Sequence, residues 1–408
     1  WGVTLGGGGL AGIAGASVDP SRPGTPGTAG SPLALFPALV HLLGSLALRP
    51  RLCDDAFLLA CATYVSKAEG PNRCTFPGAE QFRSDVFALL ETLSQCAPTL
   101  VQTAPGAVTN ALLPALADVL ARGGGSGAGT GSGGSSADGR FLALKLTCDL
   151  ALPLWLDPDL DDNTGSERDG SNPGDDGSNR NGRREALAAL IRGVLLPLCP
   201  ALLGDEDPIP LYALKLLGGA LEADAGMCGD AARLGLAPKF FEFLSLEHTN
   251  NNVHNVRLCL ALARSRAVRT LELLVDFAAG HKVAAVLAYA HENAVEPFLE
   301  PSLGICAALF SRVVDLRETS GSDPDALDAA IDGVAPLLDV VGVLIECGSA
   351  GETEVASFAV PALAAESLRL AVDLFPEEAS RAIFARGTPL ADAIDALVTE
   401  EMAWNNSV

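Results

Sequence analysis

Apolar residues recur along this chain with helical spacing. From Leu35 to Leu46 they fall three and four positions apart, which places one apolar stripe along a helix. Arg49-Pro50 is expected to end that helix. Similar spacing predicts further helices over 54–65, 81–93, 108–120, 141–155, 187–203, 211–221, 230–246, 253–263, 268–279, 283–290, 297–314, 326–345, 355–374, 377–384 and 389–398. We therefore expect an all-α protein.

The stretch from Leu195 to Leu262 contains three apolar runs separated by two breaks. The first break is acidic and rich in proline, Asp205–Pro210, and the second is small and glycine-bearing, Gly226–Gly235. Proline favours the first turn of a helix, and negative charge is favourable at a helix N-terminus. The stretch therefore predicts a helix, an acidic turn, a second helix, a glycine bend and a third helix.

This unit is repeated. Leu211-Tyr-Ala-Leu-Lys-Leu-Leu is echoed by Phe141-Leu-Ala-Leu-Lys-Leu, and a similar order returns after Val334. A period of about 40–47 residues with two or three helices is typical of armadillo and HEAT repeats. Each helix is apolar over more than one face, so the units must stack to bury their surface. We expect an armadillo/HEAT-type α-solenoid of about five to seven units.

Changes in composition divide the chain. Two segments, one rich in Gly and Ser and one rich in Asp and Asn, have little apolar surface to bury and are expected to be flexible inserts. The predicted organisation is a disordered lead-in at 1–31, N-terminal helical repeats at 32–122, a flexible insert at 123–139, one helix of the array at 140–156, a second flexible insert at 157–182, the main repeat array at 183–400 and a tail at 401–408.

The composition narrows the kind of partner and the compartment. Hydrophobic residues make up 49% of the chain but aromatic residues only 5%, which suits helix packing better than a β-sandwich. A net charge of −23 argues against nucleic acid as a partner. The ten cysteines form no CxxC pair and lie mostly in apolar runs, which is typical of buried thiols in a reducing compartment.

The ends and the apolar runs bear on localisation. The chain begins at Trp1 and shows no signal peptide, so it reads as a piece of a longer product. No apolar run reaches the ~18 residues of a membrane span without a charge or a proline. We expect a cytoplasmic protein without membrane insertion.

The motifs of common catalytic and metal sites are missing from the sequence. We find no HExxH, no GxSxG elbow and no protein-kinase signature, so no catalytic, cofactor-binding or metal-binding residue is predicted. The acidic run from Asp157 to Asp162 resembles a calcium loop, but the glycine and the closing glutamate are not at their required offsets. A solvated loop is the better interpretation.

Two features are candidates for partner binding. Asn252, His254 and Asn255 form a polar run that is either the cap and first turn of a helix or a ladder that holds an extended peptide. Arg257, Arg264, Arg266 and Arg269 are the one local reversal of sign in an acidic chain, and they suggest a site for an anion or an acidic peptide. The alternative is that these arginines pair with neighbouring carboxylates on a solvated face.

These residues also carry a resemblance. The order RFLALKLTCDLALPLW, then LLPLCPALLGDEDPIPLYALKLLGGAL, then NNNVHNVRLCLALA resembles the armadillo-type C-terminal region of the RUNKEL/Fused-like kinases, of the uncoordinated-like group. The resemblance covers 140–263 best, extends to about 398 and is weak before Gln81.

The resemblance implies a scaffold region that follows a kinase or pseudokinase domain absent from this chain, with links to microtubules, cytokinesis and cilia. It therefore implies a protein partner on the concave face, such as a microtubule-associated or motor protein, and a cytoskeletal or ciliary association. The alternative that stays open is a regulatory or substrate-docking region of an active serine/threonine kinase.

Overall fold

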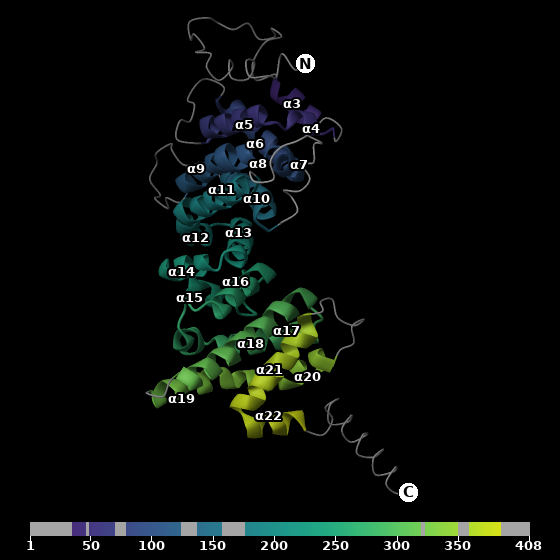
Figure 1. The fold of residues 1–408 in the computed structure, drawn as a ribbon. Helices are drawn as coiled ribbons and strands as arrows, with labels where there is room; N and C mark the ends of the chain where they lie inside the picture. Colours follow the sequence, from purple (N-terminus) through teal and green to yellow (C-terminus); the bar gives the residue numbers. More distant parts are fainter. Residues whose placement is uncertain are drawn as a thin grey trace, which may run out of the picture. The chain divides into compact units, whose positions relative to one another are not determined.

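A computed structural model describes residues 35–45, 49–69, 79–123, 137–156, 176–319, 323–349 and 359–384. These residues form helices and short connections without a strand. The chain divides into two compact units, Trp1–Ala223 and Asp224–Val408 (Figure 1). The predictions for 1–31, 389–398 and 401–408 lie outside the described residues, as do 124–136 and 157–175 of the two predicted inserts. The ends of these inserts are helical and not flexible as predicted, because one helix extends to Gly123 and others begin at Ala137 and at Asp176.

Unit 1 is a stack of antiparallel and angled helices (Figure 1). Its helices are α3 (Leu35–Leu43), α4 (Arg49–Leu52), α5 (Asp55–Ala68), α6 (Ala79–Gln95), α7 (Ala97–Thr103), α8 (Pro105–Ala107), α9 (Leu113–Gly123), α10 (Ala137–Leu156), α11 (Asp176–Leu190), α12 (Leu196–Leu202) and α13 (Ile209–Ala223). Helix α10 packs against α6, α9 and α13, so it lies at the centre of the unit.

The start of unit 1 shows how local sequence sets helix ends. The Asp54 side chain caps α5 by accepting the N–H of Phe57 at 2.8 Å, and the apolar residues predicted for this helix are buried. Arg49-Pro50 does not end the first helix as predicted. Helix α3 already ends at Leu43, and Arg49 lies in α4, where its Nε donates to the Leu43 carbonyl at 2.7 Å.

Two helices that the spacing predicts as continuous are interrupted by π-helical turns. The turns span Val108–Leu112 and Ile191–Leu195, and in each case a proline follows two residues later, Pro114 and Pro197. Proline has no N–H and its ring clashes with the carbonyl four residues before it. A wider turn accommodates both effects and keeps the apolar stripe facing the core.

The acidic break of unit 1, Asp205–Pro210, also makes a contact between helices that the sequence did not predict. The Asp205 carboxylate pairs with Arg140 of α10 at 2.8 Å, and both side chains are mostly buried. Tyr212 of α13 packs edge-on against Phe141 of α10, with ring centroids 5.5 Å apart. The break therefore joins α10 and α13 as well as opening the second of these helices. The Asp207–Pro208 peptide bond within it is cis.

Unit 2 contains α14 (Gly226–Arg233), α15 (Leu236–Phe243), α16 (Val253–Arg264), α17 (Ala279–Glu292), α18 (Glu296–Thr319), α19 (Pro324–Val334), α20 (Val341–Ser349), α21 (Ala359–Leu374) and α22 (Pro376–Ile383). Helix α18 packs against α16, α17 and α21 and is the centre of the unit. A 3-10 turn from Ala335 to Val340, with Pro336 near its start, divides the helix predicted over 326–345.

The glycine-bearing break that the sequence predicts at Gly226–Gly235 is wrong. Helix α14 occupies most of it, because Met227, Cys228 and Ala231 form an apolar face that is buried. The chain turns only at Gly235, which has a φ of 70°. Glycine adopts this left-handed conformation at little cost, so the helix predicted over 230–246 is split into α14 and α15.

The helix predicted over 268–279 is shorter in the structure, where it spans only residues 270–276. Residues 265–269 form an irregular connection, followed by a π-helical turn from Glu272 to Asp276. In contrast, the helix predicted over 297–314 is longer than predicted, because α18 continues to Thr319. The next helix, α19, begins after Asp323, whose side chain accepts the N–H of Ala326 at 3.2 Å.

Within the part of the chain that the structure describes, two stretches are long and apolar enough to cross a membrane by length and composition, Gly182–Leu202 and Glu296–Thr319. A bent pair, Ala97–Thr103 with Pro105–Arg122, passes the same test as one unit. Half of the window in α18 is buried inside the chain. In α18 the run from Pro301 to Ala307 is buried at every position, as the central helix of a packed unit requires.

One helix crossing in unit 2 depends on glycine. A Cβ at Gly280 of α17 would lie 2.2 Å from the carbonyl oxygen of Gly333 of α19. A Cβ at Gly333 would in turn lie 2.7 Å from the Cβ of Leu274. The two glycines therefore allow backbones to approach at a distance that no side chain permits.

The cysteines in the described residues are free and buried: Cys53, Cys61, Cys96, Cys148, Cys199, Cys228, Cys259, Cys306 and Cys347. This agrees with the prediction of small buried thiols for these nine. Cys74 lies outside the described residues.

Candidate functional site

The polar run of the predicted site begins α16. Asn252 is the N-cap, and its side-chain oxygen accepts the N–H groups of His254 at 3.0 Å and Asn255 at 3.2 Å. This is the capping role that was one of the two alternatives. The cap uses the side-chain Oδ1 of Asn252. His254 is half-buried in the first turn.

Asn255 faces the interior of unit 2. Its side chain is fully buried, and its Nδ2 donates to the carbonyl of Phe240 at 3.0 Å. The thiol of Cys259 donates to the same carbonyl at 3.4 Å. Asn255 therefore ties α16 to α15 and has no exposed surface for a partner. Its Oδ1 is buried without a hydrogen-bond partner.

The arginines of α16 lie on its outer side. Arg257 and Arg264 are both exposed, and they are seven residues apart, which places them on one face. The guanidinium of Arg264 lies against α18, since a Cβ at Gly304 would be 3.4 Å from its Nη2. This arginine therefore extends the exposed surface of α16 toward α18.

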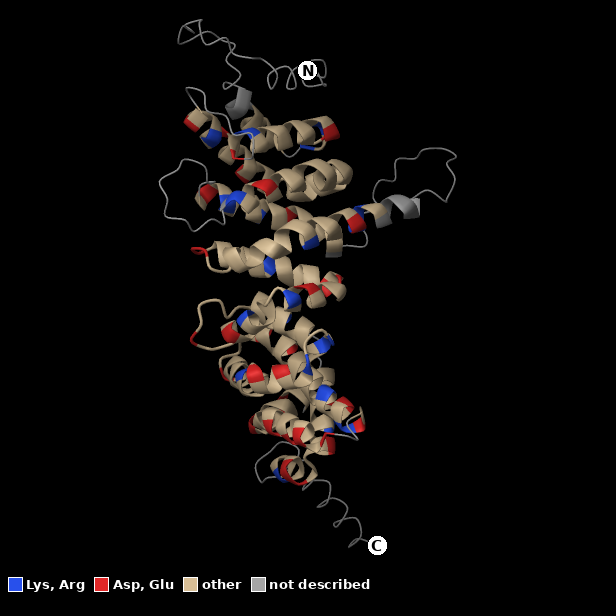
Figure 2. Cartoon of the chain, turned by 90° about the vertical axis from the view of Figure 1, so that its left-hand side faces the viewer, with Lys and Arg blue, Asp and Glu red and all other residues tan. Residues whose placement is uncertain are grey.

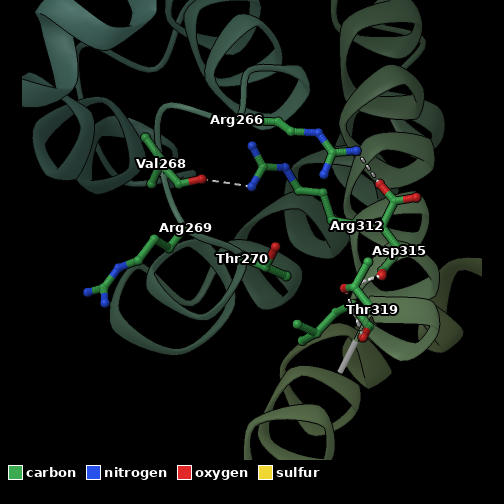
Figure 3. A pocket seen from close by; sticks show the side chains of 8 residues that line it. Arg266, Val268, Arg269, Thr270, Arg312, Asp315 and Thr319 are labelled. Carbon is green, nitrogen blue, oxygen red and sulfur yellow. Dashed lines mark hydrogen bonds and ion pairs between the residues drawn. The ribbon is translucent and has the colours of Figure 1, made fainter. Parts of the chain in front are cut away.

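The remaining two arginines border a hollow between the 265–271 segment and α18. It has a volume of about 220 Å³ and is lined by Arg266, Arg269, Thr270, Arg312, Asp315 and Thr319 over the apolar Val268 and Leu316. In Figure 3 the guanidinium groups of Arg266 and Arg312 lie near each other, whereas Arg269 points outward. We call this hollow the arginine pocket.

Arg312 forms the inner wall of the arginine pocket and holds it together. Its Nε donates to the Ala263 carbonyl at 2.5 Å and its Nη1 to the Val268 carbonyl at 2.8 Å. Its Nη2 donates to the carbonyls of Leu262, at 3.4 Å, and Ser265. These carbonyls belong to the last turn of α16 and the segment after it, so one side chain on α18 fixes the end of α16.

The electrostatics of the pocket are dominated by cations. Burial lowers the pKa of Arg312 from its ordinary value, the charge of Arg266 lowers it further, and Asp315 acts in the opposite direction. Asp315 pairs with Arg266 at 2.7 Å, and Arg269 has only a long contact with Glu272 at 3.9 Å. Among the described residues Arg312 forms no ion pair within 4 Å, so its direct hydrogen bonds all go to neutral carbonyls.

Sequence reasoning missed Arg312 and Asp315 because both lie within the largely apolar sequence of α18. A signal was present, since Arg312 is a lone cation in the run Leu309-Phe-Ser-Arg-Val-Val. A long cation inside an otherwise buried helix needs a polar partner, and carbonyls at a neighbouring helix end are common partners.

A second polar cluster, also missed, lies in unit 1. Lys145 and Asp149 of α10 pair at 3.2 Å, and Lys215 of α13 lies 3.9 Å from the same carboxylate. Ser94 of α6 hydrogen-bonds both Lys145 and Asp149. The two lysines occupy equivalent places in the repeated text Leu-Lys-Leu, which is the signal that would have found them.

Within the described ranges, no three His, Cys, Asp or Glu side chains are grouped so that they could hold a metal ion. The two clusters above are ion-paired or bonded to backbone carbonyls. This arrangement can bind charged groups.

Comparison with known proteins decides the family. Residues 26–229, half of the 408-residue chain, match the model of the HEAT repeats of ULK4-like serine/threonine-protein kinases. This chain belongs to the ULK4-like HEAT-repeat family. Residues 236–404 match the RUNKEL ARM-repeat domain, so the ULK4-like match is followed directly by a second repeat domain. The predicted resemblance and the α-solenoid fold class are both confirmed.

Two curated relatives agree with this assignment. The serine/threonine-protein kinase RUNKEL of Arabidopsis thaliana is 30% identical over 68% of this chain and 18% of its own length. The serine/threonine-protein kinase ULK4 of Mus musculus is 26% identical over 55% of this chain and 16% of its own length. The chain thus spans less than a fifth of either relative, and the matched family models describe repeats, not a kinase domain.

Among solved structures, an engineered protein aligns over 89% of this chain and 98% of its own, with 12% identity and a TM-score of 0.37. A similarity of this size carries no argument about either fold or function.

Proposed function

We propose that this ULK4-like repeat region is a non-catalytic scaffold that binds a protein partner through the arginine-bearing surface of unit 2. The observation that supports it is a run of four exposed cations within thirteen residues, Arg257 and Arg264 on α16 followed by Arg266 and Arg269 at the arginine pocket. In a chain of net charge −23, such a local reversal favours an acidic protein segment.

The charge distribution favours a local contact over a general one. Figure 2 shows acidic and basic positions interspersed along the helices of each unit. A partner with a long acidic surface would meet acidic side chains elsewhere on the chain. The proposed partner therefore presents a short acidic segment to α16 and the pocket.

Charge reversal tests this site. In a pull-down of partner proteins from cell extract, Arg257→Glu/Arg264→Glu is expected to lower recovery by about tenfold or more, because two attractive contacts become repulsive. Arg381→Glu, at an exposed position on α22, is the matched control and should leave recovery unchanged. Equal recovery with both variants would rule out the α16 surface as the binding site.

A second candidate function follows from the names of the relatives, which are serine/threonine-protein kinases. The repeat region of such a protein would then dock substrates for, or regulate, a kinase domain elsewhere in the same polypeptide. An upstream reading frame with intact kinase motifs would favour this function. A frame that lacks them would favour a pseudokinase scaffold.

The cellular setting we propose is the cytoplasm, with a link to microtubules, cytokinesis or cilia through an adaptor or a motor protein. Its support is the family resemblance. The acidic charge of the chain favours an adaptor over direct contact with an acidic filament. Co-purification of the tagged chain with and without intact microtubules would test it. An adaptor or motor protein should stay bound when the filaments are removed, whereas a chain that contacts the filament directly would lose its ligand.

A further inference from the structure

The arginine pocket has more hydrogen-bond donors than its own residues use. A guanidinium carries five N–H groups. Arg312 directs four of them to carbonyls, Arg266 directs one to Asp315, and Arg269 makes only the long contact with Glu272. Most of the donors of Arg266 and Arg269 therefore remain for a ligand, and both side chains are more than four-fifths exposed.

The pocket also has a fixed inner wall and an anion already in place. Arg312 cannot turn away, because four backbone carbonyls hold it, so its charge stays at the base of the hollow. Asp315 pairs with Arg266 at the rim and shows that a carboxylate oxygen fits there at 2.7 Å. Thr270 contributes a hydroxyl group to the same lining, whereas the Thr319 hydroxyl already donates to the Asp315 carbonyl at 2.7 Å.

From this geometry we propose that the arginine pocket binds a phosphorylated serine or threonine side chain of the partner protein. A phosphate monoester has three terminal oxygens and close to two negative charges, whereas a carboxylate has two oxygens and one charge. A phosphate can engage Arg266 and the remaining N–H of Arg312 together, and Arg269, which points outward in Figure 3, can reach the same phosphate when its exposed side chain turns inward. Planar guanidinium groups bind phosphate oxygens in pairs, which gives the site its geometric specificity.

The size of the hollow agrees with a side chain and not with a larger polyanion. A volume of about 220 Å³ accommodates one phosphorylated side chain over the apolar Val268 and Leu316. A nucleic acid or an anionic membrane would bring many charges against a chain of net charge −23, which is unfavourable. The phosphate therefore belongs to a protein segment.

The inference rests on the proposed scaffold function, and it is tested separately with peptides. The full chain is immobilised and exposed to degenerate peptide pools with a central phosphoserine or phosphothreonine. Matched pools carry serine, threonine or glutamate at the same position. We expect the phosphorylated pools to be retained at least about tenfold better than the others, since charge-assisted hydrogen bonds to phosphate are among the strongest.

Two variants assign the effect to the pocket. Arg266→Ala/Arg269→Ala should abolish the preference for phosphate, whereas Arg381→Ala on α22 should retain it. Asp315→Asn removes the carboxylate that competes for Arg266 and should raise retention by about threefold or more. Circular dichroism confirms that each variant is folded; Arg312 is left intact because it holds the end of α16.

The outcomes separate this inference from the scaffold proposal. The phosphate site is overturned if the phosphorylated and unphosphorylated pools are retained equally, or if neither pool is retained. A preference that survives Arg266→Ala/Arg269→Ala, or that Asp315→Asn fails to strengthen, overturns its placement in the pocket. The scaffold proposal is judged by partner recovery with Arg257→Glu/Arg264→Glu, which changes other residues. If Arg257→Glu/Arg264→Glu lowers partner recovery as expected but the phosphorylated and unphosphorylated pools are retained equally, only the phosphate inference is refuted.

Discussion

At the residue scale, burial sets the chemistry of the thiols. Burial raises the pKa of Cys148 and of Cys306 to about 12 from an ordinary value of 9.0. A thiol that stays protonated is neither a nucleophile nor a metal ligand. These cysteines therefore act as small apolar side chains, which is the role that their positions in apolar runs predicted.

The raised pKa values predict a loss of stability in alkali. The unfolded chain releases the thiol proton near pH 9 and the folded chain only near pH 12, so the folded state binds more protons between these values. The free energy of unfolding should fall across this window by up to about 1.4 kcal/mol per pH unit for each such thiol. Urea denaturation from pH 8 to 10.5 measures it. Cys148→Ala should show a shallower fall, and an equal slope would contradict the assignment.

A second residue-scale prediction concerns two helix ends with the same geometry. Gly235 follows α14 with a φ of 70°, and Ala294 follows α17 with a φ of 53°. In both cases the N–H of this residue bonds a carbonyl three residues back, to Ala232 and His291. Only glycine adopts this conformation without cost.

Gly235→Ala should therefore destabilise the chain by about 1 kcal/mol, and Ala294→Gly should stabilise it by about 0.5 kcal/mol after the larger entropy of the unfolded chain is included. Chemical denaturation of the two variants beside wild type checks both signs. Changes of the same sign would show that the left-handed conformation is not what these positions select.

At the element scale, the crossing of α17 and α19 is set by glycine. Gly280→Ala would drive a Cβ into the backbone of Gly333, and backbone cannot rotate away as a side chain can. We expect a loss of about 3 kcal/mol or more. The matched control is Gly342→Ala on α20, where no atom lies within 4 Å of the new Cβ.

The control should gain about 0.5–1 kcal/mol from the better helix propensity of alanine. The difference in melting temperature between the two variants measures the effect. A Gly280→Ala variant as stable as wild type would show that α17 and α19 can separate without loss.

The polar cluster of unit 1 is also an element-scale feature, since it joins α6, α10 and α13. Asp149→Ala would leave Lys145 and Lys215 without their shared carboxylate and Ser94 without an acceptor. The group is partly exposed, so the expected loss is about 1–2 kcal/mol. Glu91→Ala, at an exposed position of α6, should change stability by less than about 0.5 kcal/mol. Equal losses in the two variants, measured by urea denaturation, would contradict the network.

The elements were largely predictable because apolar spacing records which face is buried. Helices such as α5, α10, α13 and α16 begin and end within a few residues of the predicted positions. The failures have specific causes. Pro114 and Pro197 convert helix to π turns, and small residues at 226–235 form a helix because their apolar face meets a neighbour. The prolines are a local cause, whereas the helix at 226–235 depends on tertiary packing, which one sequence does not display.

The candidate site was predictable only in part for the same reason. Arg266 and Arg269 could be found from local charge, and the capping role of Asn252 from its position before an apolar run. Arg312 could not be brought to them, because it lies more than forty residues later and meets the end of α16 only in the fold. Asn255 was a candidate for partner binding because it lies in a polar run, but in the fold it is buried against α15.

At the scale of the whole molecule, charge limits the partners. A net charge of −23 creates a repulsive field toward acidic surfaces, and it is screened only at distances beyond about 10 Å at 0.1 M salt. We therefore expect the chain by itself to remain in the supernatant when microtubules, whose surface is acidic, are sedimented at low salt. Sedimentation of the chain without any added protein would contradict the adaptor model.

The grip of Arg312 on the end of α16 has one more consequence. The same guanidinium closes a helix terminus and faces the pocket, so occupancy of the pocket and fraying of that terminus are thermodynamically linked. A ligand that holds Arg312 slows the opening of the last turn, and amide hydrogen exchange around Ser265 reports it. By reciprocity, whatever loosens this turn weakens the ligand. The stability of the last turn of α16 therefore reports directly on whether the pocket is occupied.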